Sequence, residues 1–158
     1  MIDPCPFCEK LDRLHELPDD EVVWQFAHSI ALLGPWQYYT GYCVLVSRTH
    51  AAELHQLPRS QRSEFLEEMV MLARAIEVAF NPRKMNCELL GNQVPHLHWH
   101  LFPRRHDDPE ASAAVWLAID RAQRDGAEKQ RLQTGPITRS GIVARLRQTL
   151  LQMPAPTL

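Results

Sequence analysis

Apolar and polar side chains alternate most regularly in the segment from Val94 to Pro103. Three histidines occupy every second position there, with large apolar residues between them: His96, His98 and His100 alternate with Leu97, Trp99 and Leu101. A period of two residues is that of a β-strand. The histidines are therefore expected on one face and the apolar side chains on the face that packs into a core. Pro95 and Pro103 flank the segment. Proline is tolerated at strand ends but not within a central ladder, so the two prolines indicate where the strand begins and ends.

Three further segments have the composition of strands. Residues 21–26 form one, and residues 41–46 are nearly all apolar, which is typical of a central strand buried on both faces. Residues 85–90 form the third and are followed by Gly91-Asn92, a turn dipeptide. A short connection between neighbouring strands predicts that residues 85–90 pair antiparallel with the histidine segment.

Helices are predicted before and after the last two strands. From Pro58 onward, apolar side chains recur at intervals of three and four over about twenty positions, which indicates an amphipathic helix. The stripe comprises Phe65, Met69, Leu72, Ile76 and Phe80. Asn81-Pro82 ends it, since the residue before proline is pushed out of the α region. Residues 113–124 and 141–150 also have helical patterns. We therefore expect an α+β fold with an antiparallel sheet, a long helix packed on it and C-terminal helices.

Length and charge restrict the class of protein further. The chain has 158 residues and a net charge of −2, and 45% of its residues are hydrophobic. We expect a single domain over residues 1–158, with its core at about 5–104 and a helical extension at about 109–152. The charge balance gives no general attraction to nucleic acid polymers or anionic membranes. No apolar run approaches the ~18 residues of a membrane span and no leader is visible, so the cytoplasm is the expected location.

The three alternating imidazoles suggest either metal binding or covalent catalysis. Successive residues on one strand face lie about 6.6 Å apart, so His96 and His100 would be roughly 13 Å apart. All three therefore cannot easily share one ion whose bonds to nitrogen are about 2.0–2.1 Å long. Alternatively, a neutral imidazole can attack phosphorus, while its neighbours orient it and donate hydrogen bonds to phosphoryl oxygens.

The amino-acid sequence of this segment resembles a known family signature. His96-Leu97-His98-Trp99-His100 followed by Leu101-Phe102 is similar to the motif of the histidine triad (HIT) superfamily of nucleotide hydrolases and nucleotidyl transferases. The resemblance covers roughly residues 5–104 and is greatest to the bacterial branch described as diadenosine-tetraphosphate-hydrolase-like. It implies a HIT-like fold, a homodimer and a nucleotide substrate. It also implies that His98 is the nucleophile, that His100 holds phosphoryl or ribose oxygens, and that His96 gives structural support or binds metal.

A close cysteine pair lies near the start of the chain. Cys5 and Cys8 in a Cys-x-x-Cys pattern indicate metal or redox chemistry, but no strand precedes them as a thioredoxin-like context requires. In zinc-bearing relatives, positions that match Cys5, Cys8, His50 and His96 form one Cys2His2 site. The resemblance therefore implies a structural zinc ion. The alternative is that both cysteines are free thiols.

Two amides complete the expected site. Asn86 and Gln93 match positions where relatives bind phosphate or ribose, although a turn or strand-edge role is an equally good interpretation for a single amide. Many relatives carry a further histidine where this chain has Tyr42, so contacts to ribose or between histidines are expected to differ. Arg104 and Arg105 follow the histidine segment and are interpreted as a solvated pair.

These residues lead to one preferred function and two alternatives. We expect a hydrolase that acts at the α-phosphorus of a dinucleoside polyphosphate or a nucleoside phosphoramidate through a nucleotidyl-histidine intermediate. A nucleotidyl transferase would use an acceptor in place of water, and a nucleotide-binding protein would bind with little turnover. Gln93 favours polyphosphate leaving groups, because an amide cannot readily give a proton to a departing amine.

Overall fold

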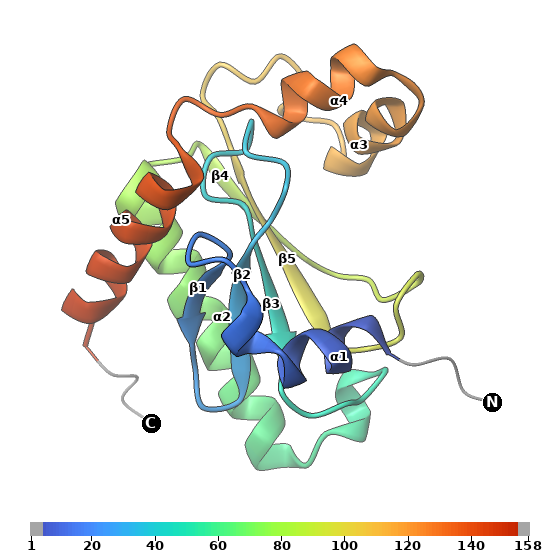
Figure 1. The fold of residues 1–158 in the computed structure, drawn as a ribbon, viewed down its shortest axis with the longest axis vertical. Helices are drawn as coiled ribbons and strands as arrows, with labels where there is room; N and C mark the ends of the chain where they lie inside the picture. The colour runs from blue at the N-terminus through green and yellow to red at the C-terminus, as the bar shows by residue number, and fades with distance from the viewer. Residues whose placement is uncertain (1–4, 155–158) are drawn as a thin grey trace.

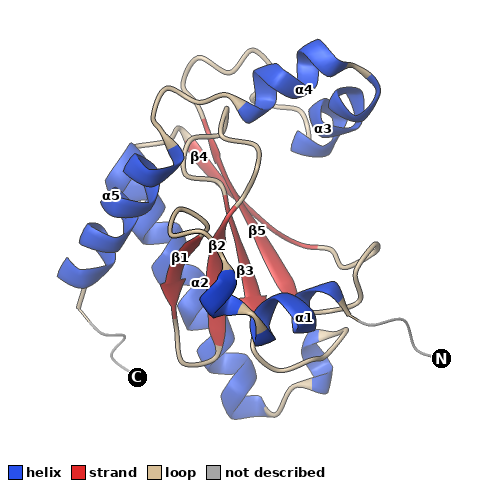
Figure 2. Cartoon of the chain, viewed as in Figure 1, coloured by secondary structure: helices blue, strands red, loops and turns tan. Residues whose placement is uncertain are grey.

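The computed structural model describes residues 5–154 and consists of a five-stranded antiparallel sheet with helices on both faces (Figures 1 and 2). The strands are β1 (Val22–Gln25), β2 (Ser29–Leu33), β3 (Cys43–Ser47), β4 (Lys84–Leu89) and β5 (His98–Arg104). Their order across the sheet is β1-β2-β3-β5-β4, and every neighbouring pair is antiparallel. The expected α+β fold, the central position of β3 and the pairing of β4 with β5 are confirmed.

Helices cover both faces of this sheet. They are α1 (Pro6–Asp12), α2 (Arg59–Phe80), α3 (Val115–Arg124), α4 (Gly126–Gln133) and α5 (Arg139–Gln152), with short 3₁₀ turns η1 (Leu14–Glu16) and η2 (Leu54–Gln56). In Figure 1, α2 lies behind the sheet, α1 lies in front of it, and α3 and α4 lie together at the top. Among the described helices, none has the length and apolar character needed to cross a membrane.

The alternation along β5 divides the core between the two faces. Leu101 is fully buried in the cluster that joins the sheet to α2 and α5, whereas Phe102 belongs to the cluster under α3. The predicted stripe of α2 faces the first cluster, with Leu72 and Ile76 fully buried. His98 and His100 have the same parity as Phe102, so the fold places them on the face covered by α1 and α3.

The histidine segment differs from the expected strand at both ends. β5 begins at His98, because the backbone turns just before it, where the N–H of His96 donates to the carbonyl of Val94 at 2.8 Å. Residues 90–97 therefore form a loop, and the predicted two-residue turn is wrong. Pro103 lies inside β5, at a position where β3 no longer pairs and only Met85 of β4 is opposite. The missing proline N–H is tolerated there because the ladder is one-sided.

Arg104 is buried, and its interpretation as a solvated residue is wrong. Its guanidinium is only 3% exposed and pairs with Asp108, with a nitrogen–oxygen distance of 2.8 Å. It also donates to the carbonyls of Glu110 and Ala113 and to the Asn86 side chain. These bonds fasten the end of β5 to the loop that leads into α3. Arg105 instead pairs with Asp107 in a partly exposed position.

Replacing Arg104 with methionine is expected to lower the free energy of unfolding by about 3–5 kcal/mol, because the buried carboxylate of Asp108 would lose its partner. Chemical denaturation of the variant and the parent protein measures this difference. The matched control is Arg105→Met, whose more exposed ion pair is worth about 0–1 kcal/mol. Equal losses in both variants would show that the buried network does not carry the effect.

Candidate functional site

His98 is held in one defined orientation at the start of β5. The residue is 6% exposed, and its Nδ1 lies 2.6 Å from the carbonyl oxygen of His96. A carbonyl only accepts, so Nδ1 carries the proton and Nε2 carries a lone pair. Phe7 of α1 packs against the ring, with centroids 4.8 Å apart. The arrangement leaves an unprotonated nitrogen on a fixed ring, which is the form a nucleophilic imidazole needs.

His100 lies beside His98 on the same face of β5. The two Nε2 atoms are 3.1 Å apart, and the hydroxyl of Tyr42 lies 2.9 Å from Nδ1 of His100. Burial lowers the pKa of His98, and burial together with the neighbouring His98 lowers the pKa of His100 to about 4. Both rings are therefore neutral near pH 7, and each offers one N–H donor and one lone pair.

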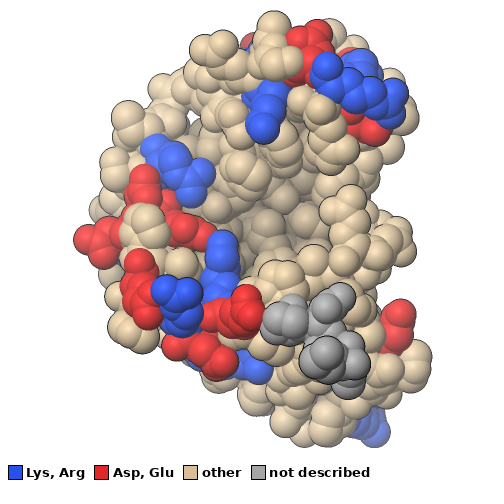
Figure 3. Space-filling view, turned by 45° about the vertical axis from the view of Figure 1, so that its right-hand side comes forward, with Lys and Arg blue, Asp and Glu red and all other residues tan. Residues whose placement is uncertain are grey.

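A cavity of about 500 Å³ opens beside these two rings. Phe7 of α1 and Trp116 of α3 line it on opposite sides, and the loop after β4 completes its wall. Figure 3 shows this face of the molecule hollowed near its middle, with tan side chains on the floor of the hollow and charged side chains at its upper and left-hand rims. The described lining residues include no Lys, Arg, Asp or Glu. Among these described residues, the groups that could hold an anion are therefore neutral hydrogen-bond donors.

The two predicted amides lie in different places. Gln93 is exposed and lines the cavity together with Asn92 and Val94. Asn86 is on β4, where its side-chain oxygen accepts a hydrogen bond from Arg104 at 3.2 Å, and it does not line the cavity. The structure thus brings Gln93, His98 and His100 together and places Asn86 in the buried network beneath α3. The substrate-binding roles of both amides stay predictions.

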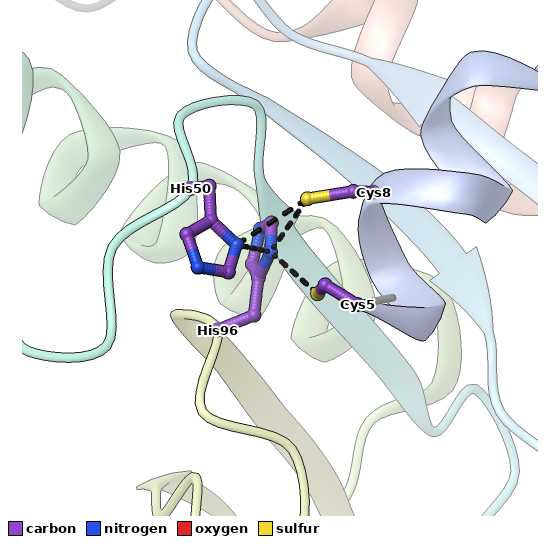
Figure 4. Close-up of side chains that lie close together, drawn as sticks. All are labelled: Cys5, Cys8, His50 and His96. Atoms are coloured by element: carbon purple, nitrogen blue, oxygen red, sulfur yellow. Dashed lines mark hydrogen bonds between the residues drawn. The ribbon is translucent and has the colours of Figure 1, made fainter. Parts of the chain in front are cut away.

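Four side chains come together where the start of α1 approaches two loops, the one that follows β3 and the one that precedes β5. Cys5 and Cys8 come from the start of α1, His50 from the loop after β3, and His96 from the loop before β5 (Figure 4). Their ligand atoms all lie within 4.8 Å of one another. Nδ1 of His96 is 3.3 Å from the Cys5 sulfur, 3.6 Å from the Cys8 sulfur and 3.2 Å from Nδ1 of His50. The four residues form a candidate metal-binding group.

The chemistry of this cluster suits a cation. Nε2 of His96 lies 2.8 Å from the carbonyl oxygen of Ser47, so it carries the ring proton and Nδ1 presents a lone pair to the cluster. A carbonyl that orients a ligating imidazole in this way is the usual support of metal sites. Ligands at about 2.0–2.3 Å from one ion lie about 3.3–3.8 Å from each other in a tetrahedron, close to the observed distances.

The aromatic wall of the cavity was not predicted from the sequence. Trp116 packs edge-on against His100, with ring centroids 4.9 Å apart, and its indole N–H donates to Glu88 of β4. The sequence signal for it was a tryptophan in the first turn of a predicted helix, but nothing in that helix indicates where it docks. Phe7 could have been found more easily, since it lies between the two cysteines.

The five-stranded antiparallel sheet, the paired imidazoles of β5 and the nearby Cys2His2 group together define a histidine triad protein. Two solved structures share the fold. A zinc-bound histidine triad family protein from Mycobacterium smegmatis superimposes with a TM-score of 0.65 at 18% identity, covering 94% of both chains. A histidine triad protein from Marinobacter aquaeolei gives a TM-score of 0.62 at 25% identity, covering 89% of this chain and 96% of the other.

Sequence comparison gives the family directly. The model of the HIT domain family matches residues 9–107, more than half of the chain, and the protein belongs to that family. It is 26% identical over 119 residues to an adenosine 5'-monophosphoramidase from Saccharomyces cerevisiae, covering 72% of this chain and 70% of the relative. It is also 26% identical over 117 residues to a protein named hit from Bacillus subtilis, covering 71% of this chain and 78% of the relative.

Proposed function

We propose that this protein is a nucleotide hydrolase that acts at the α-phosphorus of a dinucleoside polyphosphate or a nucleoside phosphoramidate. The observation that carries the proposal is the fixed ring of His98, whose protonated Nδ1 is bound to a backbone carbonyl and whose Nε2 is unprotonated beside the cavity. Membership of the HIT family and the likeness to a yeast phosphoramidase support hydrolysis at a nucleotide phosphorus.

The reaction proceeds in two displacements. Nε2 of His98 forms a bond to phosphorus as the bond to the leaving group breaks, and the electron pair departs with the leaving oxygen or nitrogen. A polyphosphate leaves as a stable anion, whereas a leaving nitrogen also takes up a proton from solvent and departs as an amine. The ring then bears a positive charge, which the carbonyl of His96 stabilises by accepting from Nδ1–H. In the second step, a water oxygen forms the new bond to phosphorus, the nitrogen–phosphorus electrons return to Nε2, and the water proton passes to solvent. The product is a nucleoside monophosphate.

A substrate panel followed by intact-mass analysis tests this proposal. The protein is mixed with a diadenosine polyphosphate or an adenosine phosphoramidate and quenched early, and a chain carrying one covalent adenylyl group is expected, together with released AMP. Release that requires an added sugar or phosphate acceptor would identify a transferase. Binding of nucleotide without release or adduct would identify a binding protein, and either outcome would contradict hydrolysis.

We expect kcat/KM for the polyphosphate to exceed that for the phosphoramidate by about tenfold or more, because even one net hydrogen bond of about 1.4 kcal/mol to the leaving group is worth tenfold. A departing amine needs a proton, whereas a nucleotide leaves as a stable anion. Gln93 offers only an amide, and His100, with its pKa of about 4, is a neutral hydrogen-bond donor near pH 7. Steady-state kinetics on one preparation measures the ratio, and a preference for the phosphoramidate would refute the argument.

The metal group is proposed to hold a structural zinc ion. Cys5, Cys8, His50 and His96 supply two sulfur and two nitrogen ligands, a complete tetrahedral set with no position left for substrate. Zinc there would supply a cross-link rather than Lewis-acid chemistry. The zinc-bound protein from Mycobacterium smegmatis has the same fold, which is consistent with this assignment.

We also propose that the protein acts in the cytoplasm as a homodimer. None of the four cysteines forms a disulfide bond, which suits a reducing compartment. Val70 on α2 is 51% exposed beside Met85 and Cys87 of β4, the edge strand of the sheet. A second copy covering this apolar strip would remove it from water. Sedimentation equilibrium is expected to give the mass of two chains, and a monomer at micromolar concentration would exclude the dimer.

A further inference from the structure

We infer that Tyr42 is a positioning residue for the reaction: its hydroxyl donates to Nδ1 of His100 and so holds the ring with its Nε2–H directed at the reacting centre. The inference rests on the proposed function, because it assigns a role within that reaction. A continuous chain of hydrogen bonds carries it, running from Tyr42 through His100 and His98 to the carbonyl of His96.

The direction of every bond in this chain follows from its fixed end. The carbonyl of His96 can only accept, so Nδ1 of His98 donates and its Nε2 accepts. The 3.1 Å contact between the two Nε2 atoms then requires the proton on His100. A neutral His100 has no second N–H, so its Nδ1 accepts and the hydroxyl of Tyr42, 2.9 Å away, donates. The low pKa of His100 is consistent with the neutral ring that this assignment needs.

The surroundings of Tyr42 keep its hydroxyl at that position. The residue is 2% exposed, and its ring stacks on Phe102 with centroids 3.9 Å apart and an angle of 8° between the planes. Gly34 leaves the space that the ring occupies, because a Cβ there would lie 2.2 Å from a ring carbon of Tyr42. These two contacts restrict the phenol, so its hydroxyl is positioned before any substrate arrives.

This arrangement matters when His98 attacks. Its Nε2 lone pair then bonds to phosphorus, so the Nε2–H of His100 is released and can donate to a phosphoryl or leaving-group oxygen. The opposite tautomer of His100 would place a lone pair against that of His98 and offer no donor. Tyr42 favours the Nε2–H tautomer, because its hydroxyl then donates to the Nδ1 lone pair while Nε2–H donates to His98, so both bonds of the His100 ring are made. The hydrogen bond from Tyr42 therefore stabilises the transition state more than the bound substrate. Its loss should lower kcat more than it changes KM.

Nitrogen-15 NMR of the histidine rings tests the bond directly, with Tyr42→Phe as the variant and Tyr39→Phe as its control. Phenylalanine keeps the ring that stacks on Phe102 and removes only the hydroxyl. Tyr39 is also buried and packs on Phe102, but it does not line the cavity. In the parent protein, His100 is expected as the Nε2–H tautomer with a hydrogen-bonded Nδ1. Its Nδ1 signal should shift or broaden in Tyr42→Phe and stay unchanged in Tyr39→Phe.

Kinetics supplies the second readout. Removing one net hydrogen bond is expected to lower kcat about five- to tenfold in Tyr42→Phe, with KM nearly unchanged and Tyr39→Phe close to the parent. An Nδ1–H tautomer of His100 in the parent, or His100 signals unaffected by Tyr42→Phe, would overturn the inference. An unchanged kcat would do the same. If the parent protein turned over no nucleotide, the proposed function would fail, while the NMR result would still decide the bond.

Discussion

The His98→Ala variant is expected to lose turnover by about 10⁴-fold or more while it still folds and binds nucleotide. A nucleophile opens a two-step route that binding and orientation alone cannot replace, and removing such a group abolishes that route. His98 contributes its ring to a cavity whose other lining side chains remain in place, so the affinity for nucleotide should change little. AMP release under saturating substrate measures the first effect, and calorimetric binding of AMP measures the second.

Two controls make this result specific. His55→Ala removes an exposed histidine from the η2 turn and is expected to keep the parent rate. His98→Asn keeps an amide N–H for the carbonyl of His96 and therefore preserves the loop, but it should be as inactive as the alanine variant. Near-parental turnover in either His98 variant would exclude the covalent mechanism.

The second large effect is expected on removal of the metal. The purified protein should carry about one zinc ion per chain, and Cys5→Ser should lose it, because a hydroxyl is a far weaker ligand than a thiolate. With free zinc at about a thousand times its dissociation constant, the ion adds about 4 kcal/mol to the free energy of unfolding. Each kcal/mol moves Tm by about 2–4 °C in a chain of this size, so a loss of about 8–16 °C is expected.

Elemental analysis and thermal denaturation with and without a chelator measure these quantities. The matched control is Cys87→Ser, a half-buried thiol on β4 outside the cluster, which should retain both zinc and its response to chelator. A preparation free of zinc whose Tm does not respond to added zinc would exclude the structural ion.

The sequence predicted those parts of the fold whose signals are local. The two-residue period of the histidine segment, the stripe of α2 and its termination at Asn81, which adopts a left-handed conformation, are all properties of neighbouring residues. The missed elements lack such signals. β2 is buried at every position and shows no alternation, whereas α4 is mostly polar with Leu132 as its one buried residue, and α1 is a seven-residue helix with none.

The candidate site was predictable by residue type but not by arrangement. The grouping of Cys5, Cys8, His50 and His96 matched the resemblance. By contrast, the turn that places His96 outside β5 was not predicted. It is closed by the hydrogen bond from the N–H of His96 to the carbonyl of Val94, and the regular alternation of side chains continues through it. The burial of Arg104 could not be predicted, because it depends on a carboxylate and on backbone carbonyls of the following loop. Its charge alone suggests an exposed side chain. The packing of Trp116 against His100 was not predicted either, because it depends on where α3 lies relative to β5 and the pattern within α3 does not specify that.

His96 belongs to both halves of the site: its ring faces the Cys2His2 group, and its carbonyl holds the proton of His98. When His98 carries a nucleotidyl group, its ring is positively charged, and the hydrogen bond from its Nδ1–H to that carbonyl becomes stronger. A metal held as proposed and a nucleotide would therefore be linked through one residue. Such linkage is reciprocal, so the factor by which zinc changes nucleotide affinity equals the factor by which nucleotide changes zinc affinity. The affinity for nucleotide would then depend on the supply of metal around the protein.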